Sequence, residues 1–166
     1  KKGMKRLIID LRENGGGLLN TCTQMVSRVI DKDKLIVYTK DKEGNKEEFK
    51  SDSGKTLEIP IIILVNGNTA SASEIMTGCL KDYGKATVVG TTTYGKGIVQ
   101  SIRQLSDGSA VKLTTAKYFT PKGNDIHKVG ITPDVEVKLD ASLLNKTEIS
   151  HEEDNQLQAA IQAVSR

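Results

Sequence analysis

The fold is decided by the stretch IIILVNGNTASASEI, residues 61–75. Its first five residues are apolar and predict a buried strand, and the polar residues 66–70 predict a tight turn. The periodicity that begins at Ile75 predicts a helix. Ser71 then stands at the helix N-terminus, where free N–H groups and the helix dipole favour chemistry through an anionic intermediate. A simpler interpretation is also open, because SASE (71–74) matches a capping box in which Ser71 only begins the helix.

A second strand–turn–helix unit stands at the start of the chain. Residues 7–11 (LIIDL) predict a buried strand, residues 12–17 form a loop that ends in three glycines, and a helix is expected from residue 18. Three consecutive glycines allow the backbone to come very close to another group. The apolar face expected for this helix consists of Leu18, Leu19, Cys22, Met25, Val26, Val29 and Ile30.

Further strands are expected along the chain, at residues 35–39, 86–89, 98–105, 110–119 and 135–137, with a hairpin return at 46–49. A terminal helix over residues 152–164 is expected to bury Leu157, Ala160, Ile161 and Val164. Buried strands that feed helices through short turns, with extra strands between them, predict the α/β class with a mixed sheet. The length of 166 residues suits one domain with its own core.

The composition is that of a globular protein and excludes several classes. Hydrophobic residues make up 37% and charged residues 27%, with a net charge of +3. Lysines are interspersed with acids and Trp is absent, so no nucleic-acid partner is expected. No apolar run approaches the ~18 residues of a membrane span. Cys22 and Cys79 are expected to be buried thiols, since they have neither metal-ligand spacing nor a disulfide framework around them.

Two candidate sites are weak. Residues 90–97 (GTTTYGKG) match a phosphate-binding loop up to Lys96, but Gly97 replaces the Ser or Thr that would hold magnesium. The residues that follow alternate like a strand, so no helix N-terminus would face a phosphate. A serine–histidine triad would have to use His127 or His151. His151 is expected at the surface beside the terminal helix, and His127 is expected to be solvated in a lysine-rich loop.

A serine with a lysine base is the third candidate. Ser71 needs a proton acceptor, and a lysine can serve only when its amine is neutral, which burial away from acids favours. Lys96 lies between two glycines with no acid beside it. Gln100 lies four positions on, so in a strand both side chains share one face and the neutral amide can hold the amine. Ala72 N–H and the Gly15–Gly17 loop would supply oxyanion donors if the strands that precede them are neighbours.

Several motifs together resemble the C-terminal processing proteases, also called tail-specific proteases, of peptidase family S41. The motifs are LIIDLRENGGGLL (7–19), ASASEI (70–75), YGKGIVQ (94–100) and GITPDV (130–135), with DGSA (107–110), KLT (112–114) and YFTP (118–121) in addition. They occur in the order of the family and cover nearly the whole chain. Each motif alone would be unspecific.

The resemblance implies roles for individual residues. The nucleophile would be the first serine of SASE, Ser71 rather than Ser73, and the base would lie 25 positions on (96 − 71). The implied catalytic residues are Ser71, Lys96 and Gln100, and the implied oxyanion donors are Ala72 and either Gly16 or Gly17. Many members have Asn-Pro-Gly-Gly where this chain has NGGG (14–17), which is a common variant.

The resemblance also implies a crotonase/ClpP-like ββα core with a mixed sheet, and a serine endopeptidase that needs no metal or cofactor and cleaves proteins near their C-termini. The expected substrates are proteins or peptides with apolar C-termini, and the expected location is extracytoplasmic: periplasm, cell envelope or secreted. A membrane anchor in the full-length protein and a homo-oligomer stay open. Residues 1–166 would form a single protease core, without the PDZ domain and N-terminal segment that members usually carry. The rival hypothesis is an inactive domain of the same fold that binds peptides or acts as a scaffold.

Overall fold

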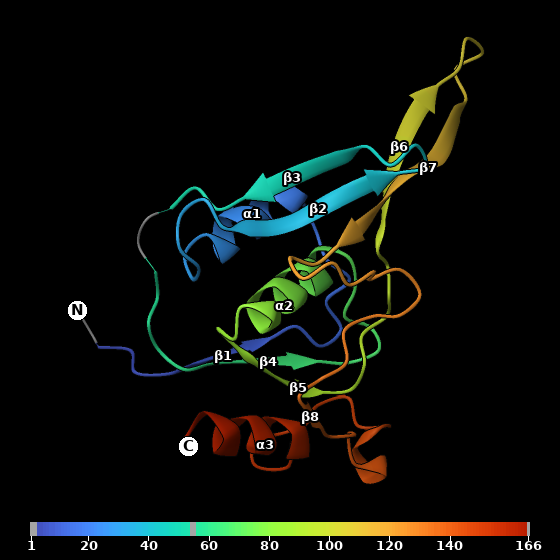
Figure 1. Ribbon diagram of the computed structural model, residues 1–166. Helices are drawn as coiled ribbons and strands as arrows, with labels where there is room; N and C mark the ends of the chain where they lie inside the picture. Colours follow the sequence, from blue (N-terminus) through green and yellow to red (C-terminus); the bar gives the residue numbers. More distant parts are fainter. Residues whose placement is uncertain (1–2, 54–55, 166) are drawn as a thin grey trace.

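The computed structural model describes residues 3–53 and 56–165, which form a layered α/β structure (Figure 1). A parallel sheet has the strand order β1-β4-β5-β8, with β1 (Leu7–Asp10), β4 (Ile61–Val65), β5 (Thr87–Gly90) and β8 (Val135–Glu136). An antiparallel sheet has the order β3-β2-β7-β6, with β2 (Leu35–Asp41), β3 (Lys46–Lys50), β6 (Ile98–Gln104) and β7 (Ala110–Phe119). The helices are α1 (Leu19–Val26), α2 (Ala72–Asp82) and α3 (Asn155–Val164), with a short 3₁₀ turn at Ala141–Leu143.

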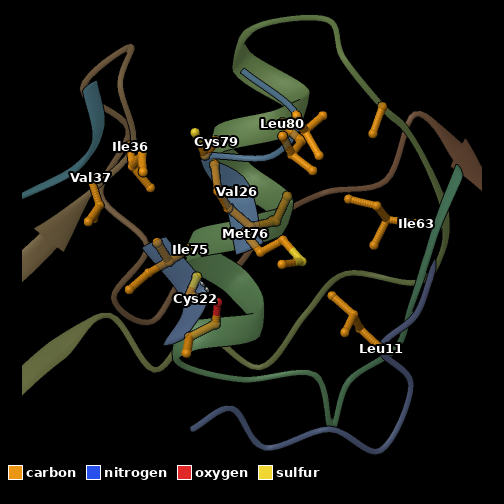
Figure 2. Packing of buried hydrophobic residues seen from close by; sticks show 14 of the residues in the cluster. Leu11, Cys22, Val26, Ile36, Val37, Ile63, Ile75, Met76, Cys79 and Leu80 are labelled. Atoms are coloured by element: carbon orange, nitrogen blue, oxygen red, sulfur yellow. Dashed lines mark hydrogen bonds between the residues drawn. The ribbon is translucent and has the colours of Figure 1, made fainter. Parts of the chain in front are cut away.

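Strand β4 is apolar throughout because both of its faces are buried. Ile61, Ile63 and Val65 belong to the cluster that α1 and α2 share with β2, and Figure 2 shows Ile63 facing these helices. Ile62 and Leu64 point the other way, into a second cluster formed with α3. The alternation along one strand therefore places a helix layer on each side of the parallel sheet.

The predicted α/β class is confirmed, and every predicted strand is present in the described residues. The parallel and antiparallel pairings, however, lie in two separate sheets. Helix α2 explains the separation, because it packs against β2 of one sheet and β5 of the other (Figure 1). Strand β1 pairs in parallel with β4, so the neighbouring strands that the oxyanion hypothesis required are observed.

Helices α1 and α3 are shorter than their periodicity predicted. Helix α1 ends at Val26, and the apolar residues 29 and 30 are buried in the turn that follows. Leu18 and Met25 are 77% and 50% exposed, so their placement in the core was wrong. Helix α3 begins at Asn155 because the Asp154 carboxylate caps it by accepting the Leu157 N–H. Ile161 was expected to face inward and is exposed.

Both cysteines are free and buried, as predicted. Burial raises the pKa of Cys22 to about 12, so its thiol stays protonated at neutral pH. Within residues 3–53 and 56–165, no helix combines the length and the apolar character that crossing a membrane demands.

Arg12 joins the loop after β1 to the start of α3. Its guanidinium lies 2.7 Å from Asp154 Oδ2 and 2.7 Å from Asp10 Oδ2. A second nitrogen of the same group donates to Asp154 Oδ1 at 3.0 Å. Burial disfavours the Asp154 charge, but hydrogen bonds from Arg12 and from the Leu157 N–H outweigh it and hold the pKa of Asp154 below its ordinary value. The pair therefore contributes stability that depends on pH.

We expect Asp154→Asn to lower the free energy of unfolding at pH 7 by about 2 kcal/mol, because it removes a bidentate charged partner from Arg12. The folded-state pKa of Asp154 lies below the unfolded value of about 3.9, so this stability is complete above that value. It is lost as the pH falls through the folded-state pKa. Urea denaturation at pH 7 and near pH 3 should show that the difference in the free energy of unfolding between variant and wild type is smaller in acid.

The matched control is Glu153→Gln at the neighbouring position, where the carboxylate forms an exposed pair with Lys146. This variant should denature like the wild type at pH 7. A gap for Asp154→Asn that stays constant with pH would contradict the assignment of the effect to its charge.

Candidate active site

Ser71 occupies a strained backbone position between β4 and α2. Its φ of 58° and ψ of −120° are those of the first central residue of a type II′ turn, where glycine is favoured. An N-cap residue ordinarily has extended backbone angles. Capping alone therefore does not explain Ser71, because a cap requires no such strain, whereas functional sites often retain it.

The glycine loop after β1 packs directly against Ser71. A Cβ on Gly16 would lie 2.7 Å from the Ala70 carbonyl oxygen, 2.8 Å from the Ala72 nitrogen and 2.9 Å from the Ser71 Cβ. Gly16 also has a φ of 98°, so both space and backbone require glycine here. The loop backbone thus lies beside the first N–H of α2, as an oxyanion site requires.

Asn14 holds this loop against the start of α2. Its backbone carbonyl accepts the Ala70 N–H at 3.0 Å, and its side-chain oxygen accepts the Gly16 N–H at 3.0 Å. The same side-chain oxygen accepts the Ser73 hydroxyl at 3.1 Å. Ser73 therefore serves the architecture of the loop, and its hydroxyl is directed to Asn14.

The carboxylate of Glu74 connects Ser71 to a distant segment of the chain. Glu74 is fully buried, and its Oε2 accepts the backbone N–H of Ser71 at 2.8 Å and that of Lys96 at 2.9 Å. Its Oε1 accepts the Thr93 hydroxyl at 2.5 Å and the Gly95 N–H at 2.6 Å. The capping-box spacing indicated the bond to Ser71, but no local signal indicated the other three, which come from residues 93–96.

Lys96 points away from this buried carboxylate. Burial alternates along residues 93–97, with Thr93, Gly95 and Gly97 buried and Tyr94 and Lys96 exposed. Because the alternation turns its side chain outward, Lys96 is exposed rather than enclosed as expected. It borders a cavity of about 690 Å³ that we call the lysine pocket, lined by Gly15, Asn68, Ala70, Tyr94, Gly95, Lys96, Ile98, His127 and Lys128.

Gln100 lies in β6, opposite Thr114 of β7, and is exposed. It does not border the lysine pocket, although Ile98 on the same strand does. Among the described residues, no hydrogen bond joins the side chains of Ser71, Lys96 and Gln100. The grouping of these three as a catalytic set stays a prediction.

A second cavity borders Ala72 and Ser73, the two residues that follow Ser71. It has a volume of about 220 Å³, and we call it the apolar pocket; it is lined by Leu11, Asn14, Gly16, Gly17, Leu18, Thr21, Cys22, Met25, Ala72, Ser73 and Met76. Leu18 and Met25, which the periodicity had assigned to the core, are among the residues of its wall. The Cys22 thiol donates to the Ala72 carbonyl at 3.2 Å and closes one end.

The weaker candidate sites can now be placed. Gly95 and Lys96 donate their N–H groups to Glu74, and residues 98–104 form a strand, so the phosphate-loop pattern has no phosphate-binding geometry. His151 is exposed, as expected. His127 is half-buried and borders the lysine pocket, so its placement as a solvated loop residue was wrong. The contact of the 126–130 turn with Gly95 and Gly97 accounts for this.

Known proteins share this arrangement of elements. Residues 1–137 match the profile of peptidase family S41. The chain is 43% identical to a carboxyl-terminal-processing protease of Synechocystis sp. over 161 residues, which are 97% of this chain and 37% of that protein. It is 46% identical over 140 residues to a probable CtpA-like serine protease of Staphylococcus epidermidis, covering 82% of this chain and 28% of the relative.

The solved structure of a photosystem II D1 C-terminal processing protease matches with a TM-score of 0.78 and 38% identity. The match covers 82% of this chain and 36% of that chain. The chain thus spans little more than a third, or less, of the length of these relatives.

We expect Ser71→Gly to raise the free energy of unfolding by about 1 kcal/mol, because glycine adopts the backbone angles of Ser71 without strain. Thermal and urea denaturation measure the change. Ser73→Gly, inside the first turn of α2, is the control and should instead destabilise the protein by about 1 kcal/mol. Loss of stability in Ser71→Gly would mean that the serine side chain contributes more than its strain costs.

Glu74→Gln should lower the free energy of unfolding by about 2–3 kcal/mol, because the new amide group would face N–H donors within the fold. Urea denaturation checks this, with the exposed Glu58→Gln as a charge-matched control that should leave stability unchanged. Equal stability of Glu74→Gln and wild type would show that the four hydrogen bonds contribute little.

Proposed function

The chain belongs to peptidase family S41, and from this premise we propose that it is the core of a serine endopeptidase that cleaves proteins near their C-termini. The observation that carries the proposal is the strained Ser71, packed against a glycine loop and directly preceded by Ala70, which borders the pocket that contains Lys96. The buried Glu74 carboxylate bonds to the backbone of both residues. A helix cap would need neither the strain nor the lysine.

In the proposed reaction, the Ser71 hydroxyl attacks the carbonyl carbon of the scissile peptide bond and Lys96 takes its proton. Lys96 then donates that proton to the leaving amine, and water releases the acyl group from Ser71. The developing oxyanion would be held by the N–H of Ala72 and by one from the glycine loop. Gly16 already donates its N–H to Asn14, which favours Gly17 as the second donor.

Lys96 is exposed in the unliganded protein and must be neutral to act as the base. A peptide lying across the lysine pocket would cover the amine and exclude water, and this disfavours the charged form. We propose that Gln100 then holds the amine through its neutral amide. The substrate thus completes the environment of the base.

The apolar pocket suits the side chain that precedes the scissile bond. Its wall is formed by Leu18, Cys22, Met25 and Met76, and it borders Ala72 and Gly17 on the oxyanion side of Ser71. A volume of about 220 Å³ accommodates a small or medium apolar side chain. We propose that substrates are unstructured proteins or peptides with apolar C-terminal segments, met in an extracytoplasmic compartment.

The activity is tested by incubating the purified protein with an unstructured polypeptide that ends in an apolar tail, with products followed by mass spectrometry. Ser71→Ala and Lys96→Ala should each lower kcat/KM by a factor of about a thousand or more, because nucleophile and base act as a unit. Ser73→Ala should keep most of the activity, since its hydroxyl only holds Asn14.

Cleavage that survives Ser71→Ala would overturn the assignment of the nucleophile, and loss in Ser73→Ala alone would move it by two residues. Absence of cleavage by a folded wild-type protein would instead support the rival hypothesis of an inactive peptide-binding domain. Denaturation curves of each variant separate a loss of chemistry from a loss of folding.

A further inference from the structure

We propose that the lysine pocket binds a carboxylate of the leaving segment, the part of the substrate on the C-terminal side of the scissile bond. Lys128 would supply the cation and His127 a hydrogen bond. The inference rests on the proposed function, because it concerns how the same site holds its substrate. It adds a charged subsite that the nucleophile and base do not require.

The two cavities border different neighbours of the nucleophile in the chain. Ala70, which precedes Ser71, borders the lysine pocket, whereas Ala72, which follows it, borders the apolar pocket. The glycine loop divides in the same way, with Gly15 on one side and Gly16 on the other. An extended peptide that crosses Ser71 therefore enters both cavities.

The base determines which end of the peptide lies in which cavity. The group that protonates the leaving amine must lie near it, and Lys96 borders the lysine pocket alone. The leaving segment consequently occupies the lysine pocket, while the acyl side chain enters the apolar one. A bond cleaved within a few residues of a C-terminus would place the terminal carboxylate close to Lys96.

The charges around the lysine pocket favour an anion. Lys96 and Lys128 both border it, and among the described residues its lining contains no carboxylate. Glu13 lies beside one of the lining residues, and its carboxylate accepts the amide of Asn68 at 2.7 Å. Asp125 lies 2.9 Å from the amine of Lys117, so this acid is already paired.

The turn that carries Lys128 is held firmly against the active-site segment. The Lys128 N–H donates to the Gly95 carbonyl at 2.8 Å. A Cβ on Gly97 would lie 2.4 Å from the His127 nitrogen, so the two backbones touch. Lys128 has a φ of 62°, an unfavourable conformation for a side chain of this kind. The contacts with Gly95 and Gly97 maintain it, as is typical of binding sites.

His127 has an unsatisfied polar atom beside the same cavity. Its Nδ1 is buried and makes no hydrogen bond to any described residue. Buried polar atoms in native structures nearly always have a partner, so a ligand that brings one is favoured. Because Nδ1 is buried, a carboxylate would reach it only after the imidazole ring turns toward the pocket; one oxygen would then accept from a protonated Nδ1 while the second faces Lys128. Lys96 stays available as the base, because Lys128 neutralises the carboxylate.

The test compares three peptides with the same apolar residues before the scissile bond. The first has a neutral leaving segment with a free C-terminal carboxylate, the second an amidated C-terminus with Asp as the first leaving residue, and the third an amidated, wholly neutral leaving segment. With the wild type, kcat/KM for at least one carboxylate peptide should be about five times that for the neutral peptide. A gain of this size is typical of a half-exposed ion pair. The preferred peptide identifies the source of the carboxylate.

Lys128→Gln should abolish this preference, measured as the ratio of kcat/KM between the carboxylate and neutral peptides, and Lys128→Glu should reverse it. Lys112→Gln is the control for loss of one exposed lysine on the β6–β7 hairpin and should keep the preference. In the wild type, raising NaCl from about 0.05 to about 0.5 M should shrink the preference, because salt screens the pair.

Equal kcat/KM for the three peptides, or a preference that persists in Lys128→Gln, overturns the carboxylate subsite and leaves the proposed protease function intact. Absence of cleavage of all three by the folded wild type overturns both. If Lys128→Gln fails to fold, the salt dependence of the wild type decides: a preference that does not change with salt also overturns the proposal.

Discussion

The geometry of the candidate site depends on one buried carboxylate. A charge without exposure to water is costly unless donors surround it, and Glu74 accepts four hydrogen bonds. These donors come from Ser71 and from residues 93–96, which the chain separates by more than twenty positions. Because the cost of burying Glu74 falls only when all the donors are in place, its burial and the alignment of the two segments are a single event. Under the proposed mechanism, catalysis and folding would thus share one interaction.

The parallel sheet provides the second constraint. Strands β1 and β4 are adjacent and parallel, so the loops that follow them meet at the same edge of the sheet. One loop contains Gly16 and the other leads to Ser71, and Asn14 bonds to both. The packing of α2 and α3 on opposite faces of β4 fixes the sheet beneath them. The proposed oxyanion donors are therefore positioned by the core rather than by the loops themselves.

Local patterns predicted most of the fold, and contacts between distant segments account for what they missed. The apolar run 61–65 and the corner at Ser71 are encoded by neighbours in sequence, and both are present in the structure. The other partners of Glu74 could not be predicted, because nothing in residues 93–96 shows that their N–H groups point at a carboxylate. Leu18 and Met25 have the periodicity of core residues, but periodicity does not distinguish a core from the wall of a cavity. The prediction of a solvated His127 failed because of contacts between distant segments, since its neighbours in space are Gly95 and Gly97.

The difference between Ser71 and Lys96 indicates how the proposed site is divided between protein and substrate. Ser71 is held in a strained conformation by the glycine loop and by α2, so its geometry exists before a substrate binds. Lys96 has a fixed backbone but an exposed side chain, so the environment that a base needs is incomplete. A peptide across both pockets would supply the missing wall. Under the proposed mechanism the serine is therefore preorganised, whereas the lysine becomes an effective base only when the pocket is occupied.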